Sequence, residues 1–130
     1  MLHEELTAKA LEACFEVAKE IGAGFLESVY EKALLIALQQ KGLEAKAQFP
    51  LTVKFRGYAV GEFYADILLE GKVIIELKAV RALNTDHQAQ LINYLNATGI
   101  EVGLLVNFGN PRLEYKRLHR YRNTTQIHVL

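Results

Sequence analysis

Two short apolar segments on either side of a glycine turn constrain the fold of this chain more than any other stretch. Apolar residues occupy the odd-numbered positions of both segments: Phe63, Ala65, Ile67, Leu69, Val73, Ile75, Leu77 and Ala79. Directly opposed residues of an antiparallel pair share a face, so we predict a hairpin in which Leu69 opposes Val73. Residues 70–72 then form the loop with Gly71 in the left-handed conformation, because a two-residue turn would mix the two faces.

The same register places three charged side chains on one face of the predicted hairpin. Asp66 should oppose Glu76, and Lys78 follows Glu76 by two positions on the same strand. Side chains two apart on a strand point the same way and lie about 7 Å apart. Charged groups within apolar runs are costly to bury unless they are paired or bind a metal. These three residues are therefore the candidate site.

Helical periodicity predicts three helices outside the hairpin, each followed by a glycine that can end it. They are expected at Glu4 to Ile21, at about Leu26 to Lys41 and at about Thr85 to Thr98. Asn84 or Thr85 can cap the third helix.

Alternating apolar residues predict a half-buried strand from Phe49 to Phe55, followed by a turn at residues 56–57. A β-bulge is expected near Gly61-Glu62, where the apolar residues change from even to odd positions. The continuous apolar run from Val102 to Val106 is typical of a strand buried on both faces. Since a helix separates this strand from the hairpin, we predict a right-handed crossover with the strand parallel to Val73–Ala79.

A last, basic strand is expected from Leu113 to Tyr121. Together these elements predict a mixed α/β fold. It has two N-terminal helices and a mixed central sheet with antiparallel hairpins and one βαβ crossover. The residues 107–109 that end the buried strand are either a functional loop or a simple turn.

Length and composition limit the class of protein. The 130 residues are expected to form one domain that buries its own core. No apolar run approaches the roughly 18 residues that span a bilayer, and the first residues lack a signal-peptide pattern, so a cytoplasmic protein without membrane contact is expected. Cys14 is the only cysteine, which excludes disulfides within the chain and thiolate zinc clusters. Its place on the apolar side of a helix predicts an inert core thiol.

The formal net charge is zero, which argues against a protein that coats nucleic acid through bulk charge alone. Basic residues nevertheless gather near the C-terminus: Arg112, Lys116, Arg117, Arg120 and Arg122. This run is either an ordinary solvated face or an edge that contacts phosphates. A basic edge on a neutral domain also suggests a protein partner or a homodimer.

The residue types of the candidate site suit metal-assisted hydrolysis. Two adjacent carboxylates, Asp66 and Glu76, repel each other unless one keeps its proton or a cation lies between them. Carboxylate oxygens with the main-chain carbonyl of Leu77 would suit Mg²⁺ or Mn²⁺. Lys78 could stabilise charge on an attacked phosphate or orient the attacking water. On spacing alone, an exposed salt bridge between Glu76 and Lys78 is the more common interpretation.

A family resemblance favours the catalytic interpretation over the salt bridge. Asp66, nine further residues, then Glu76-Leu-Lys78, on a hairpin between helices, resembles the PD-(D/E)XK nuclease superfamily, although Ala65 stands where proline is usual. Its core has the order α-β-β-β-α-β, the restriction-endonuclease-like fold. The resemblance implies that Asp66 and Glu76 bind the metal and that Lys78 gives catalytic support.

Two further motifs add residues to the site. Gly24-Phe-Leu-Glu27-Ser-Val-Tyr30 resembles the signature of the small bacterial GxxExxY family, and Gln90-Leu-Ile-Asn-Tyr94 is similar to a motif of RecB-like nucleases. The first implies that Glu27 completes the metal site, although without the family it is an ordinary first-turn glutamate. Gln90 and Tyr94 share a helix face and could hold the attacking water, a metal ligand or the nucleic-acid backbone, or simply be exposed.

We therefore expect a nuclease that depends on Mg²⁺ or Mn²⁺, with DNA favoured over RNA by analogy. Its nucleic-acid contacts would come from Tyr94, Arg112, Lys116, Arg117 and Arg120. The first alternative is a catalytically silent module of this fold that binds nucleic acid or a protein. The second is a hydrolase of smaller phosphate esters.

Overall fold

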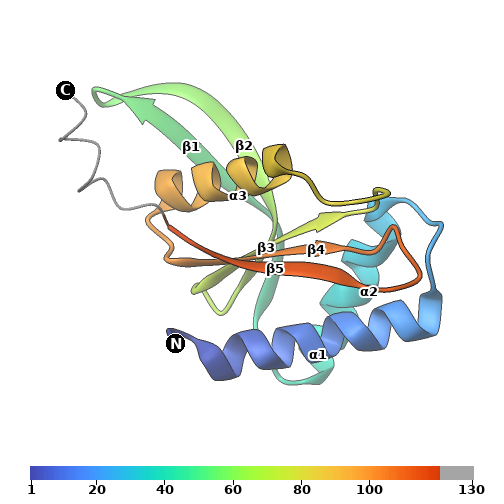
Figure 1. Cartoon of the computed structure of the whole chain (residues 1–130). Coiled ribbons are helices and arrows are strands. Elements are labelled where there is room, and N and C mark those ends of the chain that lie inside the picture. Colours follow the sequence, from blue (N-terminus) through green and yellow to red (C-terminus); the bar gives the residue numbers. More distant parts are fainter. Residues whose placement is uncertain (121–130) are drawn as a thin grey trace.

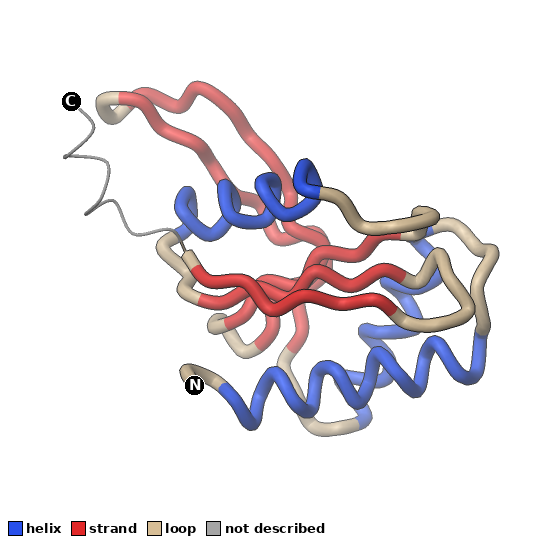
Figure 2. The backbone as a smooth tube through the Cα atoms, viewed as in Figure 1, coloured by secondary structure: helices blue, strands red, loops and turns tan. Residues whose placement is uncertain are grey.

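The computed structural model of the protein describes residues 1–120, which form a three-layer arrangement around one sheet (Figure 1). Helices α1 (Glu4–Ile21) and α2 (Glu27–Gln40) pack on one face of the sheet, and α3 (Thr85–Thr98) covers the other (Figure 2). All three helices lie within a residue or so of the predicted bounds. Asn84 caps α3: its side chain accepts from the His87 N–H at 3.0 Å, and His87 Nδ1 accepts from the Asn84 N–H at 3.1 Å.

The five strands form one mixed sheet in the order β1-β2-β3-β4-β5. They are β1 (Ala45–Phe55), β2 (Tyr58–Leu69), β3 (Val73–Lys78), β4 (Val102–Asn107) and β5 (Glu114–His119). Strands β3 and β4 are parallel and flank α3 in sequence, as predicted, and the other neighbours are antiparallel. The predicted last strand is found at β5, and its expected end, Tyr121, lies outside the described residues together with Arg122.

The predicted hairpin register is confirmed. Leu69 pairs with Val73 and Ile67 with Ile75, and the Lys72 N–H closes the loop on the Leu69 carbonyl at 2.9 Å. Gly71 has the predicted positive φ of 65°, and Glu70 is left-handed as well at 53°. The loop therefore holds two left-handed residues in succession.

One part of the alternation prediction is wrong, because the odd positions of β2 do not all face the same way. Ile67 packs on the side of α1 and α2, whereas Ala65 packs on the side of α3. The change occurs at Asp66, where the pairing with β1 skips one position and the opposed Gln48 has a φ of 50°. The predicted bulge is also present: Val53 pairs with residue 61 but Lys54 with residue 59, which leaves Val60 as the extra residue just before Gly61.

The sheet separates two groups of buried apolar side chains. The larger lies between the sheet and the two N-terminal helices and includes Cys14, whose pKa burial raises to about 12. This environment matches the predicted core thiol. The smaller lies between the sheet and α3 and includes Leu91 and Tyr94. Within residues 1–120, no helix is both long enough and apolar enough to cross a bilayer.

Candidate functional site

The carboxylates of Asp66 and Glu76 meet where β2 and β3 stop pairing. The last main-chain pair of these strands is Ile67 with Ile75. One step further, the Asp66 N–H donates to Glu76 Oε2 at 3.1 Å, and the Leu77 N–H donates to Asp66 Oδ2 at 2.7 Å. Each carboxylate thus accepts a main-chain N–H from the opposite strand, where a ladder hydrogen bond would otherwise lie. This exchange keeps both acidic groups at the gap.

Glu76 retains a proton well into the alkaline range. Its side chain is buried, with 5% exposed. Burial raises its pKa to about 9, with further contributions from the side-chain interaction with Asp66 and from the charge of that neighbour. The hydrogen bond from the Asp66 main-chain N–H and the positive charge of Lys78 lower the pKa, but by less. Without a cation, Asp66 and Glu76 are therefore not both ionised at neutral pH. A cation between them would stabilise both carboxylates in the charged form.

Lys78 points from β3 toward α3. Its Nζ donates to Gln90 Oε1 at 3.2 Å, and Gln90 Nε2 donates in turn to the Tyr94 hydroxyl at 3.3 Å. Burial raises the pKa of Tyr94, and the charge of Glu76 raises it further. Among the described residues no ion pair joins Glu76 to Lys78, so the salt-bridge interpretation does not describe this arrangement. Gln90 and Tyr94 thus lie beside Lys78, and their part in catalysis or binding stays a prediction.

On the α2 side, a pocket of about 150 Å³ adjoins Asp66. It is lined by Glu27, Ser28, Glu31, Gln48, Asp66 and Leu77. Glu27 thus lines the same pocket as Asp66, and its role in metal binding stays a prediction. Glu31 was not predicted, and its spacing of four from Glu27 is the signal that could have found it. Burial raises the pKa of Glu31, the Gln48 amide at 2.6 Å opposes the rise, and the charges of Asp66 and Glu27 add to it.

The donor atoms at this pocket fit a hard divalent cation, although they are not gathered around a single point. Carboxylates of Glu27, Glu31 and Asp66 share the pocket with Leu77, and Glu76 adjoins them. Oxygen donors of this kind suit Mg²⁺ or Mn²⁺. In the part of the chain that the structure describes, however, no three Asp, Glu, His or Cys side chains converge as a ready metal site. Binding would require at least one α2 carboxylate to turn toward Asp66.

The Tyr30 of the Gly24-to-Tyr30 motif has a structural role. Its hydroxyl donates to the Gly22 carbonyl at 2.6 Å and accepts from the Phe25 N–H at 3.1 Å, which closes the α1–α2 connection. Its ring stacks on Phe108 with centroids 4.7 Å apart. Since the Phe108 N–H donates to the Lys78 carbonyl at 2.8 Å, this stack connects α2 to the end of β3. The motif thereby helps to position Glu27 relative to Lys78.

Asn107 and Gly109 fix the position of Val80, in the segment that follows Lys78. Both main-chain polar groups of Val80 bind the fully buried Asn107 side chain, at 3.0 and 2.9 Å. A Cβ at Gly109 would lie 2.1 Å from the Val80 carbonyl oxygen, so no larger residue fits there. Of the two interpretations left open for residues 107–109, these contacts favour the structural turn.

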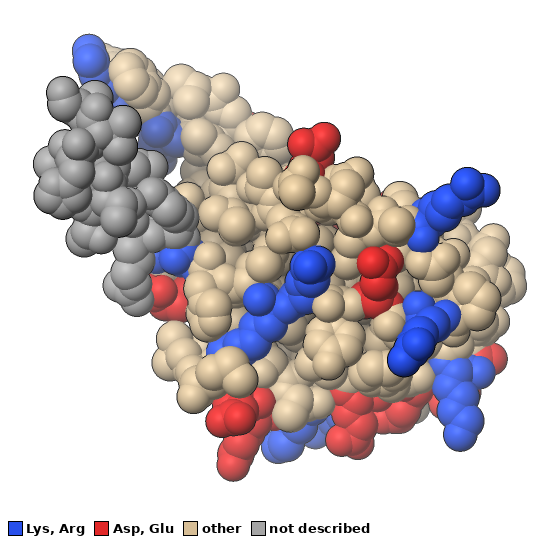
Figure 3. Space-filling model, viewed as in Figure 1, with Lys and Arg blue, Asp and Glu red and all other residues tan. Residues whose placement is uncertain are grey.

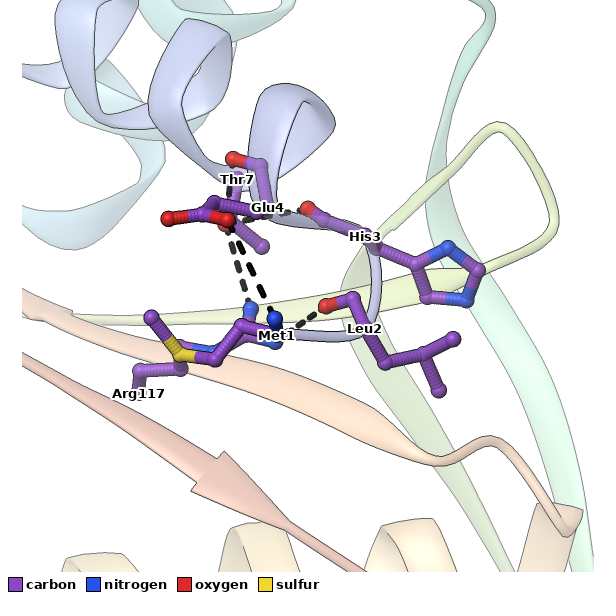
Figure 4. A network of polar contacts seen from close by, with 6 residues as sticks. All are labelled: Met1, Leu2, His3, Glu4, Thr7 and Arg117. Carbon is purple, nitrogen blue, oxygen red and sulfur yellow. Dashed lines mark hydrogen bonds and ion pairs between the residues drawn. The ribbon is translucent and has the colours of Figure 1, made fainter.

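The predicted basic contacts divide into two groups. Arg117 binds the N-terminal segment, where its guanidinium donates to Thr7 Oγ1 at 3.1 Å and to the Leu2 carbonyl (Figure 4). Arg120 pairs with Glu101 at 3.0 Å. Arg112 and Lys116 are exposed. The role of all four in nucleic-acid binding stays a prediction, and a phosphate would have to compete with the internal partners of Arg117 and Arg120.

Comparisons with known proteins agree with the class that the fold and these residues define, a nuclease-like domain with a restriction-endonuclease-like core. Residues 4–118 match the PD-(D/E)XK nuclease superfamily, and the chain belongs to it. The structure titled "Crystal structure of SSO0001" resembles this fold with a TM-score of 0.61 and 18% sequence identity. The match covers 96% of this chain and 62% of that one. A search of curated proteins finds no match. The GxxExxY and RecB-like assignments stay predictions.

Proposed function

We propose that this chain is a metal-dependent nuclease that hydrolyses phosphodiester bonds in DNA. The observation that carries the proposal is the meeting of Asp66 and Glu76 at the strand gap, with Lys78 two positions along β3. Superfamily membership supports the nuclease class. The metal, the substrate and the activity itself belong to the proposal.

The ion would be Mg²⁺ or Mn²⁺, and when bound it would polarise the phosphate and lower the pKa of the attacking water. Asp66, Glu76 and the Leu77 carbonyl would hold it, with help from Glu27 or Glu31 of α2. Glu27 is exposed in the first turn of α2, so its side chain is free to change rotamer.

The remaining side chains position the substrate. The Lys78 ammonium would stabilise negative charge that develops on the attacked phosphate. Its hydrogen bond to Gln90 holds it on the α3 side of the gap, and Gln90 is itself bound to Tyr94. This pair would orient the attacking water or the DNA strand. Arg112 and Lys116, both exposed, would contact phosphates further along the strand.

A cleavage assay on purified protein tests the proposal. DNA should be cut with Mg²⁺ or Mn²⁺ and left intact with EDTA. Glu76→Gln, Asp66→Asn and Lys78→Ala should each lower the rate by about 100-fold or more, because each removes a group that acts on the reacting phosphate, water or metal. Lys72→Ala is the matched control, since Lys72 is an exposed lysine at the opposite end of β3 and should leave the rate unchanged.

Titration calorimetry separates loss of the metal from loss of chemistry. Metal binding should weaken in Glu76→Gln and in the double variant Glu27→Gln/Glu31→Gln, but not in Lys78→Ala. Cleavage that survives Glu76→Gln and Lys78→Ala would show a contaminating nuclease. DNA binding that metal does not affect, without cleavage, would instead indicate a silent binding module. Faster turnover of model phosphate esters than of DNA would indicate a hydrolase of small esters.

A further inference from the structure

The hairpin of β1 and β2 extends beyond the rest of the sheet (Figures 1 and 2). It carries exposed aromatic rings that the core does not use. The exposed fractions of Phe55, Tyr58 and Phe63 are 59%, 76% and 44%. We call these three residues the aromatic strip. Contiguous exposed apolar groups of this kind mark interaction surfaces.

The aromatic strip lies on the hairpin face that is directed toward α3. Phe63 pairs with Leu51, which belongs to the α3-side core, and the Phe63 ring lies 5.9 Å from that of Tyr94. Phe55 follows Leu51 by four positions on the same strand and pairs with Tyr58. Since alternate residues of a strand share a face and opposed residues do too, all three rings lie on one side.

A groove of about 940 Å³ lies between this face and α3. Phe63 of the strip lines one wall, and Gln90 and Tyr94, which are hydrogen-bonded to each other beside Lys78, line the other. From Tyr58 to the residue beside Asp66, β2 covers roughly 20 Å at the usual strand rise. A strand of nucleic acid that follows this face of β2 would therefore extend from the outer end of the hairpin to Gln90 and Tyr94.

Basic and amide groups border the rings. Lys54 lines the groove, and the Arg56 guanidinium lies 4.8 Å from the centre of the Phe55 ring. Figure 3 shows Lys and Arg, and no Asp or Glu, at the outer end of the hairpin in this view. The opposite wall carries the amides of Asn93 and Asn96, with Asp86 as its acidic member. The outer part of the surface is thus complementary to phosphate.

We propose that the aromatic strip and this groove bind an unpaired nucleic-acid strand, whose bases stack on the rings while Lys54 and Arg56 contact its phosphates. Exposed rings with a basic border suit a single strand, because every base offers a flat face for stacking. In a duplex those faces are already stacked on one another. The inference rests on the proposed function, and it adds the form in which the strand would approach the site.

Fluorescence anisotropy with a labelled single-stranded DNA and its duplex tests this, in EDTA so that nothing is cut. Wild-type protein should prefer the single strand. Phe55→Ser and Tyr58→Ser should each weaken its binding about tenfold, or about 1.4 kcal/mol, and leave duplex binding unchanged. Arg56→Gln should reduce the salt dependence by about 0.7 in the slope of log K against log salt, because one phosphate contact is lost.

Tyr64→Ser is the matched control. Tyr64 is 59% exposed on the same hairpin, but it pairs with Pro50 and so lies on the opposite face. It should bind the single strand as wild type does, and melting curves of all variants should confirm that they are folded. An equal loss in Tyr64→Ser, or undiminished binding in Phe55→Ser and Tyr58→Ser, would overturn the inference.

Two further outcomes keep this inference separate from the proposed function. The first is a sedimentation result in which the wild-type protein is a dimer and Phe55→Ser and Tyr58→Ser are monomers. This result would mean that the aromatic strip binds a second copy of the chain, and it would overturn the inference. Cleavage is then measured with Mg²⁺ or Mn²⁺ on the same proteins. Single-strand binding of the expected pattern without any cleavage would refute the proposed function alone, whereas cleavage without that pattern would refute the inference alone.

Discussion

Asn107 shows how one buried side chain can organise the chain around the candidate site. Its amide oxygen accepts from the N–H groups of Val80 and Gly109, and its amide nitrogen donates to the Val80 carbonyl and to Glu114 Oε1. All four hydrogen-bonding positions of the side chain are therefore used. Because Asn107 pairs with Lys78 across β3 and β4, the same contacts fix the chain as it leaves the site.

We expect Asn107→Ala to lower the free energy of unfolding by about 2–4 kcal/mol, because it leaves buried partners without a hydrogen bond. Urea unfolding measures the loss. Asn110→Ala is the control: its amide donates to the Arg81 carbonyl at an exposed position, so its effect should stay within about 0.5 kcal/mol. Equal losses in the two variants would show that the Asn107 network contributes little.

The acidic pair and its lysine could be found from sequence because they depend only on strand alternation and register. Strand alternation could find neither Glu31 nor Gln48, although the helical spacing of four from Glu27 points to Glu31 once Glu27 is assigned to the site. Glu31 reaches the pocket because α2 packs beside Asp66. Gln48 reaches it because it lies opposite Asp66 in the sheet, with a left-handed φ of 50°. Arg117 has a distant partner too, since its guanidinium reaches Thr7 of α1. Such contacts arise from packing between elements far apart in the chain.

Among the elements, α2 owes its position relative to the sheet partly to Tyr30. The hydroxyl ties the α1–α2 connection and the ring packs on Phe108. We expect Tyr30→Phe to cost about 1–2 kcal/mol of unfolding free energy, because the hydrogen bonds are lost while the stack remains. Thermal unfolding measures this against Tyr115→Phe, whose ring is half-exposed. Tyr30→Leu should be less stable than Tyr30→Phe, since it also loses the stack; equal stability would contradict this role.

The helices and the β2–β3 hairpin form where the spacing of apolar residues predicts them, whereas the start of β1 and the change of face in β2 do not follow from that spacing. Three helices and the β2–β3 register were predictable because apolar spacing alone specifies them. The start of β1 was missed, since residues 45–48 contain none of the β-branched or aromatic residues that favour strands. These residues become a strand because they pair with the end of β2, where Ala45 meets Leu69. The change of face at Asp66 also needs the neighbouring strand, and no single segment could reveal it.

For the whole molecule, the proton that Glu76 retains should make stability depend on pH. Its pKa rises from the ordinary value of 4.5 to about 9 in the folded protein, chiefly through burial and then through Asp66. Between those values the folded chain holds a proton at Glu76 that the unfolded chain has lost. Its contribution to stability is complete below pH 4.5 and is lost as the pH rises toward 9, at no more than about 1.4 kcal/mol per pH unit.

Glu76→Gln should flatten this dependence, because glutamine keeps a neutral donor beside Asp66 at every pH. Urea unfolding in metal-free buffer from about pH 5 to 9 should show wild-type stability falling toward alkaline pH and the variant at least as stable as wild type at pH 8. Glu62→Gln, at an exposed position of β2, should keep the wild-type slope. A variant clearly less stable at pH 8 would mean that Glu76 is ionised in the folded protein and held by Lys78 as a structural ion pair.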